Sequence, residues 1–310
     1  MLLGLHIKDA HFSTTTWVLQ SAQAAFQILS DLHLETGNQY KSFQVPVQAP
    51  ILILAGDIGR LHDYENYLFF ISTQCANFDQ VCLVLGNHEF YGVSRAEGLE
   101  LAYRLQREPS TLGKLSVLNR TRLDVDPSIC VLGCTLQSHI RTENRAEVQS
   151  RIKDFRRIHD WSVDDHNTEH AKDLEWLRNE VDLIRLESKR LSREKTILVI
   201  THHAPIRKGS SHPKHEENPW ADGFATDLLG VPEGISRVDW WIFGHTHFTN
   251  QWRQHGVNLV SNQRGYAFNT GNEAQLSQEP YQQRIWRIIS SSFTREMRFD
   301  PRKCIEVKAL

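Results

Sequence analysis

The sequence of 310 residues has few cysteines and no long apolar run. Its 5 cysteines are an odd number without a C-x-x-C pair, and most lie in apolar stretches. We therefore interpret them as buried, reduced thiols, which argues against a zinc-thiolate site. The opening residues, MLLGLHIKDAHF, have too short an apolar run and too early a charge for a signal peptide. No stretch approaches the ~18 apolar residues of a membrane span. We expect a cytoplasmic protein without a membrane partner.

The charge balance also lacks a strong excess of either sign. A net charge of -2 gives no field that would attract a polyanion, and no continuous basic stripe is present, so nucleic acid is not an expected partner. The composition, 40% hydrophobic and 23% charged, is that of an ordinary globular protein. No internal repeat or linker divides the chain. We predict one domain over residues 26–310, preceded by a poorly ordered extension over residues 1–25.

Short apolar runs alternate with helical patterns along most of the chain, which is typical of a layered α/β fold. The apolar runs predict strands at residues 26–30, 51–55, 81–85, 117–118, 129–132, 197–200, 238–243, 257–261 and 285–289. Helical spacing of apolar residues predicts helices at residues 62–76, 95–107, 151–158 and 168–191. Two segments have a pattern that is hard to interpret, an insert at about 137–173, within which the short helix at 151–158 lies, and a loop at 206–222. We expect both to shape a binding pocket, with Trp161 and Trp220 as candidates for its wall or for an exposed binding edge.

Five predicted strands end in side chains that commonly bind metals. These strand ends are Asp31-x-His33, Asp57, Asn87-His88, His202-His203 and His245-x-His247. Ligands of open α/β sheets bind at the carboxyl ends of strands, where the connecting loops converge. Oxygen and imidazole donors without thiolate suit Mn²⁺, Fe or Zn²⁺ and disfavour a closed structural zinc site.

Each strand end has an ordinary explanation when it is taken alone. Asp31 and His33 are compatible with a capped turn, and Gly86-Asn87 with a plain turn dipeptide. His245 and His247 would lie on one solvated face if they belonged to a regular strand. They can aim at one point only if the backbone leaves the extended conformation. Five such coincidences in a fixed order favour the metal site.

The order D-x-H, G-D, G-N-H-E, T-H-H and G-H-T-H resembles the calcineurin-like metallophosphoesterase family. The blocks run from Asp31 to His247, and the stretches 26–35 and 261–266 are similar to small members from fungi and bacteria. The resemblance implies an α/β fold in which a sandwich of two β-sheets is flanked by helices, in four layers. It also implies a centre of two divalent or mixed-valence metal ions at the strand ends, with residues 137–173 as a cap-like insert.

The resemblance also assigns roles to individual residues. One metal would be held by Asp31, His33 and His247, the other by Asn87, His202 and His245, and Asp57 would bridge the pair. His88 matches a histidine that is not a ligand and that assists the leaving group or the transition state. Its own partner is either Asp31 or another nearby carboxylate.

The second block departs from the familiar form G-D-x-x-D-R. It reads Gly56-Asp57-Ile58-Gly59-Arg60, so one acidic residue is missing and the arginine comes one place early. This departure weakens any transfer of protein-phosphatase substrates to this chain. As substrate contacts we name Arg60, His203 and His139, because a cation or an imidazole can bind phosphate. For His203 the alternative is that it supports a metal ligand instead of contacting the substrate.

The resulting expectation is a hydrolase of small phosphate esters that depends on two metal ions. Two cations about 3.5–4 Å apart lower the pKa of a bridging water and neutralise the charge that develops on phosphorus oxygens. The metal-bridging hydroxide would attack phosphorus while His88 assists the leaving group. Three alternatives stay open: a phosphodiesterase or nuclease in place of a phosphomonoesterase, a related hydrolysis of a non-phosphate bond, and a non-catalytic metal-binding scaffold. No protein partner can be inferred.

Overall fold

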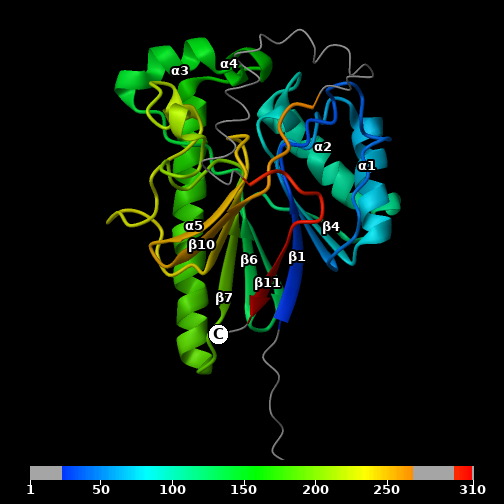
Figure 1. Ribbon diagram of the computed structural model, residues 1–310, viewed down its shortest axis with the longest axis vertical. Helices are drawn as coiled ribbons and strands as arrows, with labels where there is room; N and C mark the ends of the chain where they lie inside the picture. Colours follow the sequence, from blue (N-terminus) through cyan, green and yellow to red (C-terminus); the bar gives the residue numbers. More distant parts are fainter. Residues whose placement is uncertain (1–22, 268–296, 309–310) are drawn as a thin grey trace, which may run out of the picture.

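Two mixed β-sheets form the centre of the computed structural model, which describes residues 23–267 and 297–308 (Figure 1). The first sheet has the order β11-β1-β2-β3-β4 and the second the order β5-β6-β7-β8-β10-β9. The first sheet consists of β1 (Gln23–Leu29), β2 (Ile51–Ala55), β3 (Gln80–Val84), β4 (Leu115–Val117) and β11 (Cys304–Lys308). The second consists of β5 (Thr121–Asp126), β6 (Ile129–Gly133), β7 (Thr196–Ile200), β8 (Trp240–Phe243), β9 (Asn250–Gln254) and β10 (Val257–Ser261).

The inner strands of both sheets are parallel, and the antiparallel strands β11, β5 and β9 lie at the sheet edges. Strands β1 to β4 pair in parallel, as do β6, β7, β8 and β10. Because parallel strands end at the same edge of a sheet, the loops that follow β1, β2, β3, β7 and β8 come together. All five predicted motif blocks lie on these loops.

The two sheets face each other across an apolar core. Ile28, Ile53 and Cys82 of the first sheet pack in one cluster with Leu198 and Ile242 of the second. All five side chains are fully buried, and burying a large apolar side chain contributes about 1.5–3 kcal/mol. This layer fixes the distance between the strand ends that carry the motif residues.

Helices cover the two outer faces of the sandwich, as Figure 1 shows. Helices α1 (Tyr64–Asn77) and α2 (Arg95–Arg107) pack on the first sheet, where Tyr67 and Leu105 join the cluster around Leu54. Helix α5 (Val163–Leu191) packs on the second sheet, where Leu177 and Val199 share a cluster. The predicted α/β/β/α layering is therefore confirmed.

The bounds of the predicted helices agree with the structure to different degrees. Helix α2 has the predicted bounds and begins with a capping box between Ser94 and Glu97. Helix α5 begins at Val163, earlier than predicted, because Ser162 and Asp165 also form a capping box. The helix predicted at 151–158 is wrong in extent. Helix α3 (Arg145–Arg151) ends at the first residue of this range and α4 covers only Asp154–Arg157, since Ile152 between them is extended and buried.

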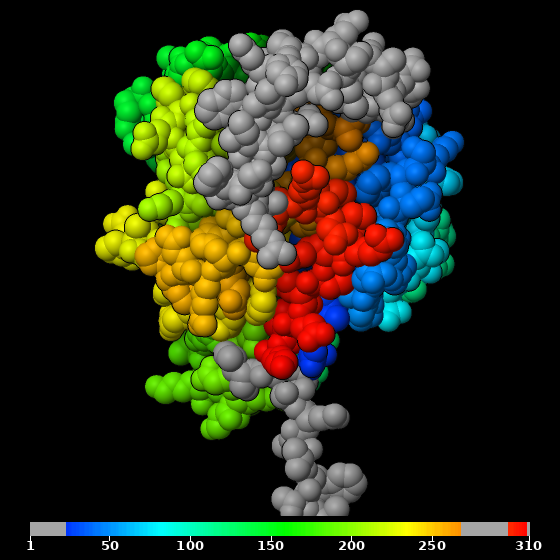
Figure 2. Space-filling model, in the orientation of Figure 1, coloured from blue at the N-terminus to red at the C-terminus, as the bar shows by residue number. Residues whose placement is uncertain are grey.

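Several strand predictions need correction. Strand β1 begins at Gln23, so residues 23–25 belong to the first sheet and not to an extension. Strands β5 and β11 were not predicted, because TRLDVD and CIEVK mix polar and apolar residues at the sheet edges. Residues 297–308 run between the first strand and the segment near residue 250, as Figure 2 shows on this face of the molecule. The strand predicted at 285–289 lies outside the described residues.

Among the helices in the described ranges, none combines the length and apolarity that crossing a membrane would require.

Candidate metal centre

The backbone turns sharply at five of the predicted ligands. Asp31, His33, Asp57, His245 and His247 have φ angles of 51°, 46°, 54°, 72° and 51°, in the left-handed region that residues other than glycine rarely adopt. Each such residue costs on the order of 1–3 kcal/mol, and such residues cluster at functional sites. The two histidines of G-H-T-H thus leave the extended conformation, as the metal-site interpretation required.

Two glycines of the motif blocks are needed because another chain segment approaches them closely. A Cβ atom at Gly86 would lie 2.3 Å from Asp57 Oδ1, and one at Gly244 would lie 2.6 Å from Asp31 Oδ2. Both distances are far below van der Waals contact. The glycines of G-N-H-E and G-H-T-H therefore let two carboxylates approach the loops that carry Asn87 and His245.

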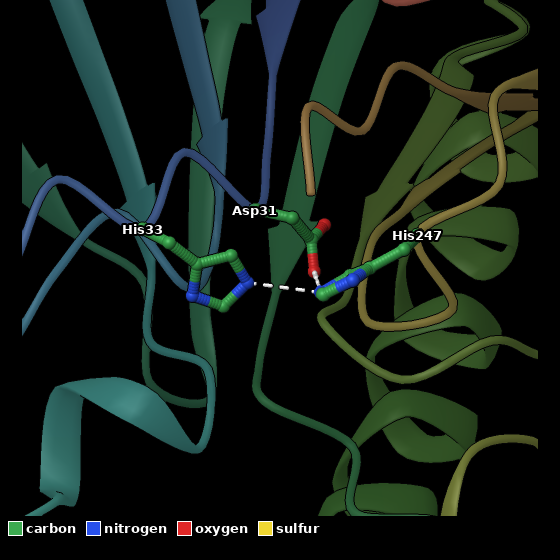
Figure 3. Close-up of side chains that lie close together, drawn as sticks. All are labelled: Asp31, His33 and His247. Carbon is green, nitrogen blue, oxygen red and sulfur yellow. Dashed lines mark hydrogen bonds and ion pairs between the residues drawn. The ribbon is translucent and has the colours of Figure 1, made fainter. Parts of the chain in front are cut away.

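Asp31, His33 and His247 form one group of converging donors (Figure 3). The Nε2 atoms of His33 and His247 lie 2.9 Å apart, and Asp31 Oδ1 lies 3.5 Å from His247 Nε2. Figure 3 shows the two rings pointing at each other, with the Asp31 carboxylate beside the His247 ring. The His33 and Asp31 side chains are buried, whereas the His247 side chain is 32% exposed and opens the group to solvent.

Asp57, His202 and His245 form a second group, and Asn87 lies next to it. His202 Nε2 is 3.3 Å from Asp57 Oδ1 and 3.1 Å from Asn87 Oδ1. Its Nδ1 is 2.9 Å from the carbonyl oxygen of Ala55 and can donate to it, which leaves Nε2 free to act as a ligand.

Asp57 lies between the two groups. Its Oδ1 faces His202 at 3.3 Å and its Oδ2 faces His33 Nε2 at 3.9 Å. Its side chain is 2% exposed. Each carboxylate oxygen is thus directed at a different histidine, as a carboxylate that bridges two cations requires.

The buried charges of this region shift the pKa values of their neighbours. Burial alone would raise the pKa of Asp57, but the nearby histidines, His202 foremost, hold it well below its usual range. Burial alone would lower the pKa of His202, but the Asp57 carboxylate outweighs burial and raises it to about 10. Burial and the neighbouring His202 lower the pKa of His245 well below its usual value. Buried carboxylates that face several imidazole nitrogens at 3–4 Å suit divalent cations, and this donor set fits the two metals that the sequence implied.

The buried carboxylate of Glu89 connects two of the ligand loops. It accepts hydrogen bonds from the backbone N–H groups of Gly86, Asp57 and Ile58 at 2.7–2.9 Å, and from the Tyr67 hydroxyl at 3.0 Å. Burial and the Asp57 charge raise its pKa to about 7, although the backbone donors oppose this shift. Glu89 therefore fixes the positions of Asp57 and Asn87 relative to each other.

His88 lies at the edge of the centre between two partners that the sequence did not identify. Its Nδ1 is 2.7 Å from Glu35 Oε1 and its Nε2 is 3.0 Å from the Tyr266 hydroxyl. Burial alone would raise the pKa of Glu35, but the neighbouring imidazoles of His33 and His88 outweigh burial and lower it to about 2. Burial alone would lower the pKa of His88, but Asp57 and Glu35 outweigh burial and raise it. The partner of His88 is thus Glu35, which follows the D-x-H block by two residues, and not Asp31.

A further carboxylate that the sequence did not reveal orients Asn87. The Asn87 amide nitrogen donates to Asp154 at 2.8 Å and to the Tyr91 hydroxyl at 3.1 Å. The amide oxygen consequently faces His202. Asp154 comes from the insert at 137–173, so the insert also supports the metal centre.

The three predicted substrate contacts lie at different distances from this centre. Arg60 lies beside Glu35, with Nε 3.9 Å from the Glu35 carboxylate. His203 is fully buried behind the centre, with its ring 4.2 Å from the His245 ring. His139 is exposed, and its backbone N–H donates to Thr226. None of the three lines the described cavity that contains His88 and Asp57.

The family model for calcineurin-like phosphoesterases matches residues 25–248. The chain belongs to this family. Members are generally phosphoester hydrolases with two metals, so the family supports hydrolase activity for this calcineurin-like phosphoesterase.

Relatives of this calcineurin-like phosphoesterase are distant in sequence. It is 23% identical over 270 residues to the uncharacterized protein L509 of Acanthamoeba polyphaga mimivirus, covering 79% of this chain and 92% of the viral protein. The phosphopantetheinyl hydrolase of Mycobacterium tuberculosis has the same fold, with a TM-score of 0.54 and 16% identity over 84% of this chain and 95% of the other. A dimetal phosphatase from Danio rerio gives a TM-score of 0.45 and 13% identity over 77% of this chain and 87% of the other.

Proposed function

We propose that this calcineurin-like phosphoesterase hydrolyses small phosphate esters at a centre of two divalent cations. Asp31, His33 and His247 would hold one cation and Asn87, His202 and His245 the other. Asp57 would contact both, and the placement of its two oxygens between the two groups is the observation that carries the proposal. Two bound cations supply an activated water and neutralise the phosphoryl oxygens; Mn²⁺, Fe and Zn²⁺ suit the donors.

The cavity beside this centre suits an anionic substrate. It has a volume of about 370 Å³ and is lined by ligand residues together with His88, Tyr266, Arg151 and Lys153. A volume of this size holds a small molecule. The Lys153 amine makes no ion pair or hydrogen bond with any residue in the described ranges, so its charge is available to a phosphate. Lys153 and Arg151 would attract the ester and offset its negative charge.

His88 is placed to transfer a proton at the edge of this cavity. Glu35 accepts a hydrogen bond from Nδ1–H and thereby favours the protonated ring, which leaves Nε2–H as the proton that faces the cavity beside Tyr266. A leaving oxygen within reach of Nε2 would receive this proton. Tyr266 also stacks on His33, with ring centroids 4.3 Å apart, so it keeps His33 and His88 in a fixed relation.

A substrate panel tests this function. The purified protein is reconstituted with Mn²⁺, Fe²⁺ or Zn²⁺ and assayed with p-nitrophenyl phosphate and bis-p-nitrophenyl phosphate, which also separates monoesterase from diesterase activity. We expect hydrolysis, and a His88→Ala variant that keeps its metals but turns over about 10²–10⁴-fold more slowly. Stoichiometric metal without hydrolysis of either ester class would contradict the proposal and favour a non-catalytic metal-binding scaffold.

A further inference from the structure

A second cavity of about 200 Å³ opens beside the cavity that contains His88 and Asp57, which we call the catalytic cavity. His215, Phe224 and Thr246 line both cavities, so the two are adjacent. Thr246 stands between the predicted ligands His245 and His247 in the G-H-T-H block. We call this second space the side cavity. Through Thr246 it adjoins the metal centre.

Two aromatic side chains contribute to the wall of the side cavity. Trp220 and Phe224 line it together with the small side chains of Ala221 and Ala225. The Phe224 ring stacks on His245, with centroids 4.8 Å apart and an interplanar angle of 27°. One aromatic wall is therefore tied to a predicted metal ligand.

The loop that carries these aromatic residues is anchored by a buried carboxylate. Asp222, fully buried, accepts hydrogen bonds from Arg141, Asn144 and Arg207. The next residue, Gly223, offers its carbonyl oxygen to His245 Nε2 at 3.1 Å. This short segment is consequently fixed both to the insert and to the metal centre, and it presents Trp220 and Phe224 in defined positions.

Arg151 and Lys153 form a cationic rim of the catalytic cavity, and Trp220 connects this rim with the side cavity. The Arg151 guanidinium lies over the Trp220 ring, 4.4 Å from its centroid. Arg151 lines the catalytic cavity and Trp220 the side cavity. A phosphate that contacts Arg151 would therefore have an aromatic surface beside it.

Several polar groups of the side cavity are already paired within the protein. Arg207 pairs with Asp222, Glu216 accepts from the backbone N–H of Gly209, and Asn218 lies 3.2 Å from His215 Nδ1. The cavity would thus select its occupant largely by shape and apolar contact, while Ser211 offers a hydroxyl to a heteroatom. A cavity of 150 Å³ can hold benzene, so this one accommodates an aromatic ring.

We propose that the side cavity binds a flat aromatic or heteroaromatic ring of the substrate, so that ring-bearing phosphate esters such as nucleotides are preferred over esters without a ring. This inference rests on the proposed phosphoesterase function. Stacking of a base on an aromatic side chain contributes about 1–3 kcal/mol, which corresponds to about 5–150-fold in kcat/KM.

Two matched pairs of esters test the inference on the metal-loaded protein. Adenosine 5'-monophosphate and ribose 5-phosphate share the same phosphate ester bond and differ in the base. The methyl ester of adenosine 5'-monophosphate and the methyl ester of ribose 5-phosphate form the corresponding diester pair. We expect kcat/KM to favour the ring-bearing ester at least 5-fold in the pair that is hydrolysed. Trp220→Ala should reduce this ratio, Trp220→Phe should keep most of it, and the distant control Leu186→Ala, exposed on α5, should leave it unchanged.

The outcomes separate the two proposals. Equal kcat/KM within the hydrolysed pair, or a ratio that Trp220→Ala does not change, overturns the ring subsite and leaves the phosphoesterase function standing. If none of the four esters is hydrolysed, the proposed function fails. Calorimetric binding of adenosine 5'-monophosphate and ribose 5-phosphate then still decides the ring subsite. Tighter binding of the nucleotide, lost in Trp220→Ala, supports it, and equal binding refutes it.

Discussion

The Glu35→Gln substitution isolates the part of the mechanism that the structure added to the sequence. Glu35 Oε1 lies 2.7 Å from His88 Nδ1, and both side chains are 7% exposed. The substitution keeps the size of the side chain and removes its charge. His88 would then lose the carboxylate that favours its protonated form, while Asp57 would still act on it. The His88 ring would then be protonated in a smaller fraction of the molecules, so Nε2 would carry the proton that faces the cavity less often.

The expected loss of activity follows from the hydrogen bond that is removed. A hydrogen bond to a charged group contributes about 1.5–3 kcal/mol, so kcat should fall about 10–150-fold. KM should change little, because Glu35 does not line the catalytic cavity within the described residues. The assay measures kcat and KM with the ester that the substrate panel identifies, and metal content by mass spectrometry.

Metal content distinguishes a role in proton transfer from a role in binding. Glu35 Oε1 also lies 3.6 Å from His33 Nδ1, so a structural role would appear as loss of metal. The matched control is Glu100→Gln, at an exposed position on α2, which should behave as the wild type. Unchanged kcat in Glu35→Gln with two metals bound would refute the pairing of Glu35 with His88 as part of the mechanism.

Three further predictions concern the cationic rim, the loop packing and the buried histidines. Lys153→Gln should raise KM several-fold at low salt, whereas Lys189→Gln in the last turn of α5 should not; steady-state kinetics checks both. Gly86→Ala should weaken metal binding at least 10-fold in a chelator competition, since the new Cβ would meet the Asp57 carboxylate; affinity equal to the wild type would contradict the packing argument. Burial lowers the pKa of His170 to about 4, so the neutral His170 contributes fully to the free energy of unfolding above pH ~6.5. This contribution should fall by about 1 kcal/mol at pH 5.5. Urea titrations should show that His170→Gln reduces this loss.

The parts of the fold that the sequence predicted are those in which local patterns and burial agree. Strands β2, β3 and β7 are apolar on both faces, because one face packs on the other sheet and the other under helices. These apolar runs could therefore be recognised from the local sequence alone. Strand β11 is recognisable only through its pairing with β1, in which Gln23 meets Lys308 at the far end of the chain. The first turns of α5 were missed because buried polar residues such as His166 do not extend an apolar stripe.

The candidate site likewise has a part that the sequence predicts and a part that only the structure reveals. The predicted ligands follow apolar strands directly, so their convergence could be inferred from topology. Glu35, Tyr266 and Asp154 come from loops and from the insert, and only the folded chain brings them to His88 and Asn87. A carboxylate or phenol in a loop has no periodic signal, because its partner is determined by tertiary packing. The absence of one acidic residue from the second motif block does not indicate that Glu35 contacts His88.

The most direct test of the central claim is the metal stoichiometry of the Asp57→Asn variant beside that of the wild type. Both proteins are stripped with a chelator, reloaded with Mn²⁺ and analysed by mass spectrometry, with circular dichroism as a check on folding. The account predicts two metal ions per wild-type chain, fewer than two in the folded variant, and hydrolysis that returns only as both ions bind. Two tightly bound ions and full activity in Asp57→Asn, or full hydrolysis by the stripped wild type, would contradict it.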